Sequence, residues 1–199
     1  MILSVVLRLR GGGYPKYIVD NAARLNDDRD TVKGNFHGLY VNILSYWFPP
    51  TEGYEVAPHW PITGATKDQY ISFVIKGLQP QDPLLLLLEV KPPSDFHLDR
   101  KREAAITQIT ERLDVFGPIN ECPRLYAISA VGKRWRASYV AKGKGSKVGQ
   151  PVEGIAAVNS LRSADPDCWN PDITSDSSWE ALRNIVETIK GYAIQKTST

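Results

Sequence analysis

The chain has 199 residues, of which 42% are hydrophobic and 23% charged, and its formal net charge is +2. These values are typical of a folded domain with a core of its own, and they exclude a disordered or fibrous chain. A net charge this close to zero indicates no class of partner by itself. No apolar stretch is long enough for a transmembrane helix, so we expect no membrane association.

The cysteines and histidines form no recognisable metal motif. Cys122 and Cys168 are far apart, which excludes a disulfide framework and a zinc pattern. His37, His59 and His97 also show no metal-binding spacing, and His37 reads as a capping or packing residue. The apolar N-terminal segment is too short for a secretory signal. We therefore expect a reducing compartment, the cytoplasm or the nucleus.

The segment before Tyr14 ends in Leu-Arg-Leu-Arg followed by three glycines. Residues Leu7–Gly12 resemble the C-terminal tail of ubiquitin, but the segment is far too short for a ubiquitin fold. It is either the remnant of a ubiquitin-like module or an exposed strand with a flexible glycine linker. In both cases Gly11–Gly13 predict a boundary. We expect residues 1–13 to lie apart from a single domain at 14–199.

Hydrophobic periodicity predicts the helices and strands of this domain. The predicted helices span residues 18–25, 36–48, 99–116 and about 178–193. The predicted strands span residues 54–57, 69–76, 84–88, 124–131 and 136–141.

The strand at Leu84–Leu88 consists of five leucines bounded by prolines on both sides. An unbroken apolar run of this length is typical of a central strand with both faces buried. Glu89 and Lys91 follow at its end and share one face, because side chains alternate along a strand. The ordinary interpretation of such a pair is a salt bridge at the end of the sheet.

A second carboxylate is predicted near this pair. Asp68 precedes the strand at 69–76, and the two strands are consecutive in the chain. If they pair antiparallel, Asp68 and Glu89 meet at one end of the sheet. The helix at 99–116 follows, and Gln108 lies on the flank of its apolar stripe.

An acid before one strand, Glu-x-Lys at the end of the next and a following helix with glutamine resemble the PD-(D/E)-x-K nuclease superfamily. The resemblance covers about residues 36–139. Residues 85–99, 105–117 and 125–139 also resemble a group of fungal proteins of that fold. Nuclease-like domains of this kind occur in Crinkler-type effectors, which carry an N-terminal ubiquitin-like region. The resemblance implies an α/β fold with a mixed central sheet flanked by helices and a restriction-endonuclease-like core. It further implies that Asp68 and Glu89 bind the metal, that Lys91 is catalytic and that Gln108 faces the site.

The first acid of the resemblance has two candidate positions. In the family it usually lies within the strand and precedes a hydrophobic residue. By that criterion Ser72, followed by Phe73, occupies the place instead of Asp68, and a metal ligand is missing. Glu52 and Glu55 are further carboxylates that the sequence does not place.

The chemistry of phosphodiester cleavage explains these residue types. Two neighbouring carboxylates hold Mg²⁺ or Mn²⁺, hard cations that prefer oxygen ligands. The metal stabilises negative charge on the phosphate and favours hydroxide formation from bound water. A lysine beside the metal orients or deprotonates that water.

A basic stretch supplies a candidate contact surface for nucleic acid. It consists of Lys133, Arg134, Trp135, Arg136, Lys142, Lys144 and Lys147. Basic side chains bind phosphates and an interleaved aromatic ring stacks on bases. The alternative is a solvated hairpin with the tryptophan in the core.

Two hypotheses follow from the sequence. The first is a Mg²⁺-dependent or Mn²⁺-dependent nuclease that acts on DNA in preference to RNA. The second is an inactive protein of the same fold that binds nucleic acid or a protein partner, as an effector would.

Overall fold

The computed structural model describes residues 13–27, 32–62, 70–78, 83–143, 150–151 and 165–196. The ubiquitin-tail resemblance, Asp68, Lys144 and Lys147 lie outside these residues. The helices are α2 (Lys16–Arg24), α3 (Gly34–Trp47), α4 (Asp99–Phe116) and α5 (Asp176–Lys196). Short 3-10 helices span Pro50–Glu52, Pro93–His97 and Pro166–Cys168.

Six strands form one mixed sheet in the order β1-β2-β3-β4-β5-β6. Their bounds are β1 (Tyr54–Pro61), β2 (Tyr70–Gly77), β3 (Leu84–Lys91), β4 (Arg124–Val131), β5 (Arg134–Ala141) and β6 (Gln150–Pro151). Only β3 and β4 pair in parallel among these strands, and every other neighbouring pair is antiparallel. The predicted α/β class with a mixed sheet flanked by helices is confirmed.

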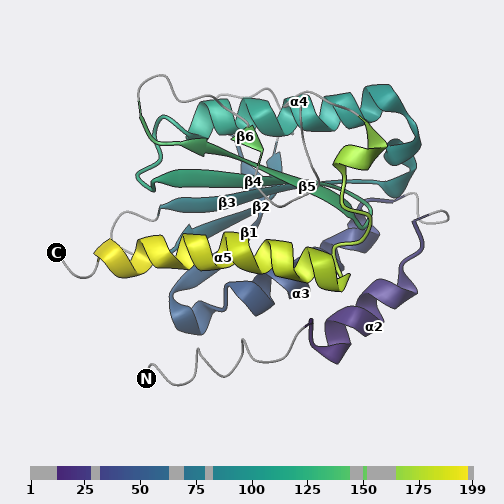
Figure 1. Ribbon diagram of the computed structural model, residues 1–199, viewed down its shortest axis with the longest axis horizontal. Coiled ribbons are helices and arrows are strands. Elements are labelled where there is room, and N and C mark those ends of the chain that lie inside the picture. The colour runs from purple at the N-terminus through teal and green to yellow at the C-terminus, as the bar shows by residue number, and fades with distance from the viewer. Residues whose placement is uncertain are drawn as a thin grey trace.

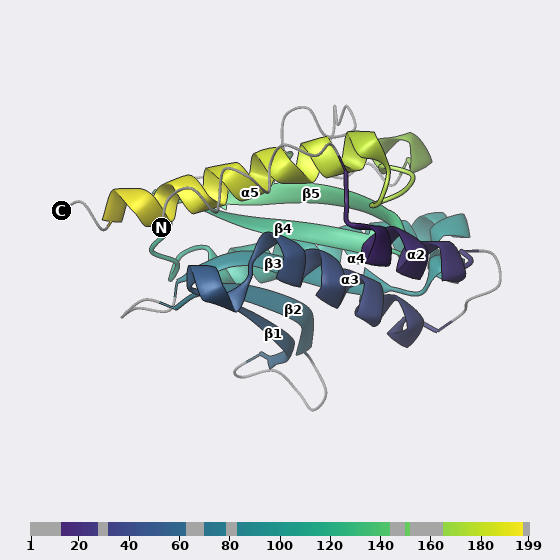
Figure 2. The same ribbon diagram turned by 90° about the horizontal axis from the view of Figure 1, so that it is seen from below.

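The helices cover both faces of the sheet. Figure 1 shows α4 along one face and α5 with α3 along the other. Figure 2 shows the same layers from below, with α2 beside α3 and the sheet in the middle. The parallel pair β3–β4 requires a crossover connection, and α4 supplies it. Glu89 and Lys91 therefore end a strand that leads directly into this crossover.

The predicted central position of the leucine strand is confirmed, since β3 lies between β2 and β4. Leu86, Leu88 and Val90 pack into the core shared with α3 and α5. Leu87 packs on the opposite face, in the core shared with α4. Alternation places Glu89 on the same face as Leu87, toward α4.

Three strands are longer than the sequence predicted. β3 extends past Leu88 to Lys91 because it continues to pair with β4. β1 extends past Ala57 to Pro61 because it pairs with β2 along its length. β5 begins at Arg134 because a two-residue turn, Gly132 and Lys133, connects it to β4. Gly132 has a φ of 61°, which a glycine adopts without steric cost and which the first position of such a hairpin turn requires.

Within the described residues, no helix combines the length and the apolar character needed to cross a lipid bilayer. Cys122 and Cys168 are both buried, and neither forms a disulfide with a described residue.

Candidate functional site

The sheet divides between β2 and β3 close to Glu89. The backbone pairing of these strands ends at Phe73 and Leu88. Beyond it, β2 continues to pair with β1 as far as Tyr70, and β3 continues to pair with β4 as far as Lys91. Figure 2 shows β1 and β2 curving away from β3 at one end of the sheet. We call this division the fork.

Side chains replace the missing backbone ladder in the fork. The Ser72 main-chain N–H donates to Glu89 Oε2 over 3.3 Å. The Val90 N–H donates to Ser72 Oγ over 3.0 Å. Each of these contacts joins a side chain of one strand to the backbone of the other. Ser72, one of the two candidates that the resemblance offered for the first acid, thus lies directly beside Glu89.

Glu89 is a buried carboxyl group, and the groups around it compensate only in part for the removal of its charge from water. Its side chain is 2% exposed, and the nearest cation, Lys91 Nζ, lies 3.7 Å from Oε1. Burial raises the pKa of Glu89, because removal from water disfavours the charged form. Lys91, the Ser72 N–H, Lys33 and Arg112 oppose this shift without cancelling it.

The charges around Glu89 are mostly positive. Lys91 extends from β3, Lys33 precedes α3, and Arg112 projects from α4. Arg112 is 8% exposed, and its buried Nε has no hydrogen-bond partner among the described residues. Lys33 Nζ donates a hydrogen bond to the Tyr70 hydroxyl oxygen over 2.9 Å. Three cations therefore act on one carboxylate.

A second serine lies on the other side of Glu89. Ser129 on β4 is paired in register with Glu89 and is 1% exposed. Its hydroxyl has no hydrogen-bond partner among the described residues. The two strands that flank Glu89 thus present serines, Ser72 and Ser129, and no carboxylates at this level.

The described residues do not fit a Mg²⁺ site of the kind that the resemblance implies. They contain no cluster of three or more histidine, cysteine, aspartate or glutamate side chains suited to a metal ion. Glu52 pairs with Lys190 at 2.6 Å. Glu55 pairs with Lys76, four residues from Ser72 along β2, or about 13 Å at the usual rise per residue. Asp68, the predicted first acid, lies outside the described residues.

Gln108 and Arg112 lie one helical turn apart on α4. Gln108, predicted to face the site, is half-buried. Arg112 is the α4 residue whose charge lowers the pKa of Glu89. The sequence contains a signal for it, because Arg112 follows Ile109 by three residues and therefore lies on the apolar stripe of the helix.

The predicted stacking role of Trp135 is wrong, and the alternative of a core residue holds. Its side chain is fully buried, so neither ring face is open to a base. Its Nε1–H donates to Ser178 Oγ on α5 over 2.9 Å, which satisfies the one polar atom of the indole. Trp135 therefore joins β5 to α5.

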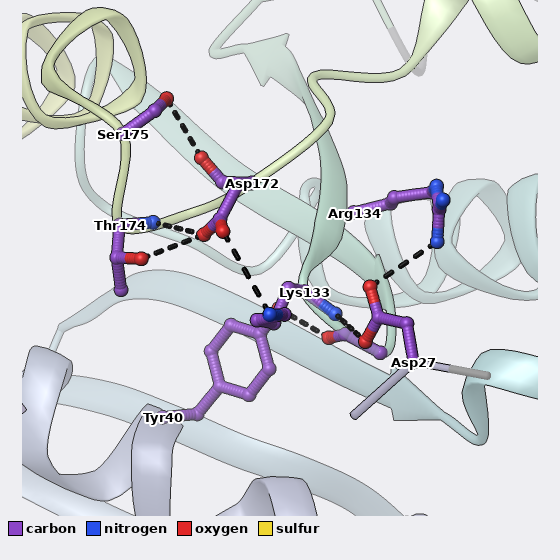
Figure 3. A network of polar contacts seen from close by, with 8 residues as sticks. Asp27, Tyr40, Lys133, Arg134, Asp172, Thr174 and Ser175 are labelled. Atoms are coloured by element: carbon purple, nitrogen blue, oxygen red, sulfur yellow. Dashed lines mark hydrogen bonds and ion pairs between the residues drawn. The ribbon is translucent and has the colours of Figure 1, made fainter. Parts of the chain in front are cut away.

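Two of the neighbouring basic residues, Lys133 and Arg134, are paired with acids (Figure 3). Arg134 donates to Asp27 Oδ2 over 3.1 Å, and the Lys133 main-chain N–H donates to Asp27 Oδ1 over 3.2 Å. Lys133 Nζ lies 3.9 Å from Asp172 Oδ2. Arg136 is buried and packs over the Trp169 ring. The contacts with Asp27 and Asp172 thus account for the charges of Arg134 and Lys133 without a nucleic acid.

The distal part of the basic stretch begins at Lys142. Lys142 is exposed and donates to the Glu121 carbonyl over 3.4 Å. Lys144 and Lys147 lie outside the described residues. Among the described basic residues of this stretch, Lys142 is thus the one that remains open to a phosphate.

The fork also contains residues that the sequence did not single out. Lys33 and Tyr70 come from segments far apart in the chain, and Ser129 has no neighbouring motif. Their proximity to Glu89 follows from strand pairing and helix packing, which no local pattern encodes.

No family model, curated protein or solved structure matches the chain significantly.

We expect Glu89→Gln to stabilise the protein at neutral pH. Because the pKa of Glu89 is raised in the folded state, folding favours the neutral carboxyl. The neutral carboxyl therefore contributes its full stability to the fold below the usual pKa of 4.5. That contribution is lost as the pH rises through the folded-state pKa. The glutamine side chain of the variant is uncharged at every pH. The free energy of unfolding from urea titrations should therefore favour the variant at pH 7 and converge with wild type toward pH 4.5.

Glu55→Gln is the matched control, because Glu55 is 44% exposed and pairs with a single lysine. Its effect should be small at both pH values. A Glu89→Gln variant that is less stable than wild type at pH 7 would mean that the ion pair with Lys91 outweighs the burial of the charge.

Proposed function

We propose that this chain is a nuclease-like protein of the PD-(D/E)-x-K type that binds the phosphate backbone of nucleic acid at the fork and does not cleave it. The observation that carries the proposal is the position of Ser72. Its backbone N–H and hydroxyl bridge β2 to Glu89 and Val90, where a metal-dependent nuclease needs its first carboxylate. A hydroxyl supplies no negative charge to a divalent cation.

The charge balance of the fork supports an anionic ligand. Lys33, Lys91 and Arg112 all favour the ionised form of Glu89, so the group as a whole carries an excess of positive charge. A divalent cation would be repelled by this excess, whereas a phosphate would be attracted. Lys91 is 25% exposed and Lys33 half-exposed, so both ammonium groups are open to a ligand.

Glu89 has a positioning role in this proposal. Its Oε1 lies near Lys91 Nζ, and its Oε2 accepts from the Ser72 backbone. A carboxylate held in this way restrains the side chain of Lys91 at the fork. The entropy lost when the lysine binds a phosphate is then smaller.

A metal-dependent nuclease is the second candidate function. The observation in its favour is the desolvated Glu89 carboxyl, whose pKa stays raised despite three nearby cations. Such a group at a strand end is typical of functional sites. This candidate requires a second carboxylate, and Asp68 is the residue that the resemblance offers.

We expect binding of a short DNA or RNA oligonucleotide to weaken with salt. Lys33→Gln and Lys91→Gln should each reduce the slope of log affinity against log salt by about one unit, because each removes one phosphate contact. Fluorescence anisotropy over a range of NaCl concentrations measures this slope.

Lys133→Gln is the matched control, since Lys133 is of the same residue type and already faces Asp172. Its slope should equal that of wild type. If Lys133→Gln changes the slope and neither Lys33→Gln nor Lys91→Gln does, the nucleic acid binds to the β4–β5 hairpin and not at the fork.

A further inference from the structure

Two histidines that are 22 residues apart in the chain meet beside the fork. His37 on α3 and His59 on β1 have ring centroids 5.5 Å apart. Two imidazoles that share one zinc ion through bonds of about 2.0–2.1 Å at a tetrahedral angle have ring centroids about 5 Å apart. The separation of the pair is therefore close to that of two ligands of a single metal ion.

His37 has a nitrogen that the described structure leaves without a partner. Its Nε2 is buried and makes no hydrogen bond to the described residues. Buried polar atoms are nearly always paired, and an unpaired one calls for a bound ion or water. An imidazole nitrogen is also among the commonest protein ligands for zinc.

The backbone at His59 is unusual for its residue type. Its φ is 49°, the only positive value among non-glycine residues in the described part of the chain. The β1–β2 register pairs the residues on either side of it with Phe73 and Ile71, but not His59 itself. Such a conformation is costly and recurs at functional sites. Here it accompanies the approach of the His59 ring to His37.

Aromatic neighbours hold the two rings. Phe73 packs edge-on against His37 with centroids 5.3 Å apart. Tyr70 packs edge-on against His59 with centroids 5.0 Å apart. Rings fixed in this way lose little side-chain freedom on binding a ligand, so the pair is preorganised.

We propose that His37 and His59 form a binding site for a zinc-like transition-metal ion, with water in the remaining coordination positions. The ion would join α3 to β1, the strand that follows it in the chain. This site is distinct from the carboxylate-based Mg²⁺ site of the nuclease candidate, because its ligands are nitrogens of softer character. It does not depend on whether the fork binds nucleic acid.

Lys33 supplies an internal test of this assignment. Its ammonium group bonds Tyr70, which in turn contacts His59, so a positive charge lies near the pair. A bound cation would be repelled by it. Lys33→Gln should therefore strengthen metal binding, an effect that loss of a packing contact would not produce.

The experiment is a titration of the full chain with ZnCl₂, followed by calorimetry. We expect binding of one zinc ion, and at least a tenfold loss of affinity in both His37→Gln and His59→Asn. Asparagine is used at His59 because it tolerates positive φ. The matched control is His97→Gln, which removes the exposed third histidine and should leave the affinity unchanged. Glu89→Gln should also leave it unchanged, which separates this site from the fork.

Ring-proton NMR of the wild-type chain gives a second readout that needs no variant. One equivalent of ZnCl₂ should shift the His37 and His59 signals and leave those of His97 in place. The proposal is overturned if wild type takes up no zinc at millimolar concentration, if the zinc shifts His97 alone, or if neither His37→Gln nor His59→Asn weakens binding.

Discussion

Leu86→Ala is expected to lower the free energy of unfolding by about 2–5 kcal/mol. Leu86 is fully buried in the third strand of the sheet. Its removal takes apolar surface out of the core shared with α3 and α5 and leaves a cavity that a strand paired on both sides cannot collapse to fill. Urea denaturation of wild type and variant at the same pH measures the difference.

Leu98→Ala is the matched control, because it deletes the same atoms from a side chain that is 45% exposed. Its effect should stay within about 0.5 kcal/mol. A Leu86→Ala effect as small as that of the control would contradict the central position of the leucine strand.

Ser72→Asp is expected to create Mn²⁺ binding at the fork. Ser72 already lies against Glu89, so an aspartate there would place a second carboxylate beside the first and convert the fork into a site with two oxygen ligands of negative charge. Without metal the variant should be less stable than wild type, because two buried carboxylates repel each other. With MnCl₂ its melting temperature should rise, since a ligand that binds only the folded state stabilises it.

Ser72→Asn is the control, since asparagine has nearly the shape of aspartate without its charge. It should gain no Mn²⁺ binding. Wild-type protein is expected to take up neither Mn²⁺ nor Mg²⁺ by calorimetry and to cleave neither DNA nor RNA. Cleavage by wild type that requires metal and is abolished by Asp68→Asn and Glu89→Gln would instead establish the nuclease candidate, with Asp68 as the first acid. In that case Lys91→Ala should spare metal binding and remove most of the rate.

The regular elements were largely predictable because their signals are local. The helix at Asp99–Phe116 has an apolar stripe, and Gly117 with Pro118 ends it, so its bounds agree with the structure. The run Leu84–Leu88 between prolines predicted a buried central strand for the same reason. Errors arose where pairing extended a strand, as at β1, which continues to Pro61 against β2.

The candidate site was predictable only in part. The sequence places Glu89 and Lys91 on one strand face, since alternation is a property of the backbone. It left Asp68 and Ser72 as alternatives for the neighbouring position, and it offered two readings of Trp135. The complete burial of Trp135 shows that it is a core residue. The hydrogen bond to Glu89 places Ser72 at the fork.

By itself, then, the sequence determined the α/β class, the central leucine strand and the Glu89–Lys91 pair, because periodicity and strand alternation are encoded over a few residues. Only the tertiary structure decided which charges surround Glu89, and that His37 meets His59. Lys33 immediately precedes α3, Arg112 lies on α4 and Tyr70 on β2, and their approach depends on how these elements pack. The energy of a buried charge depends on every group within a few ångströms, whatever its distance along the chain.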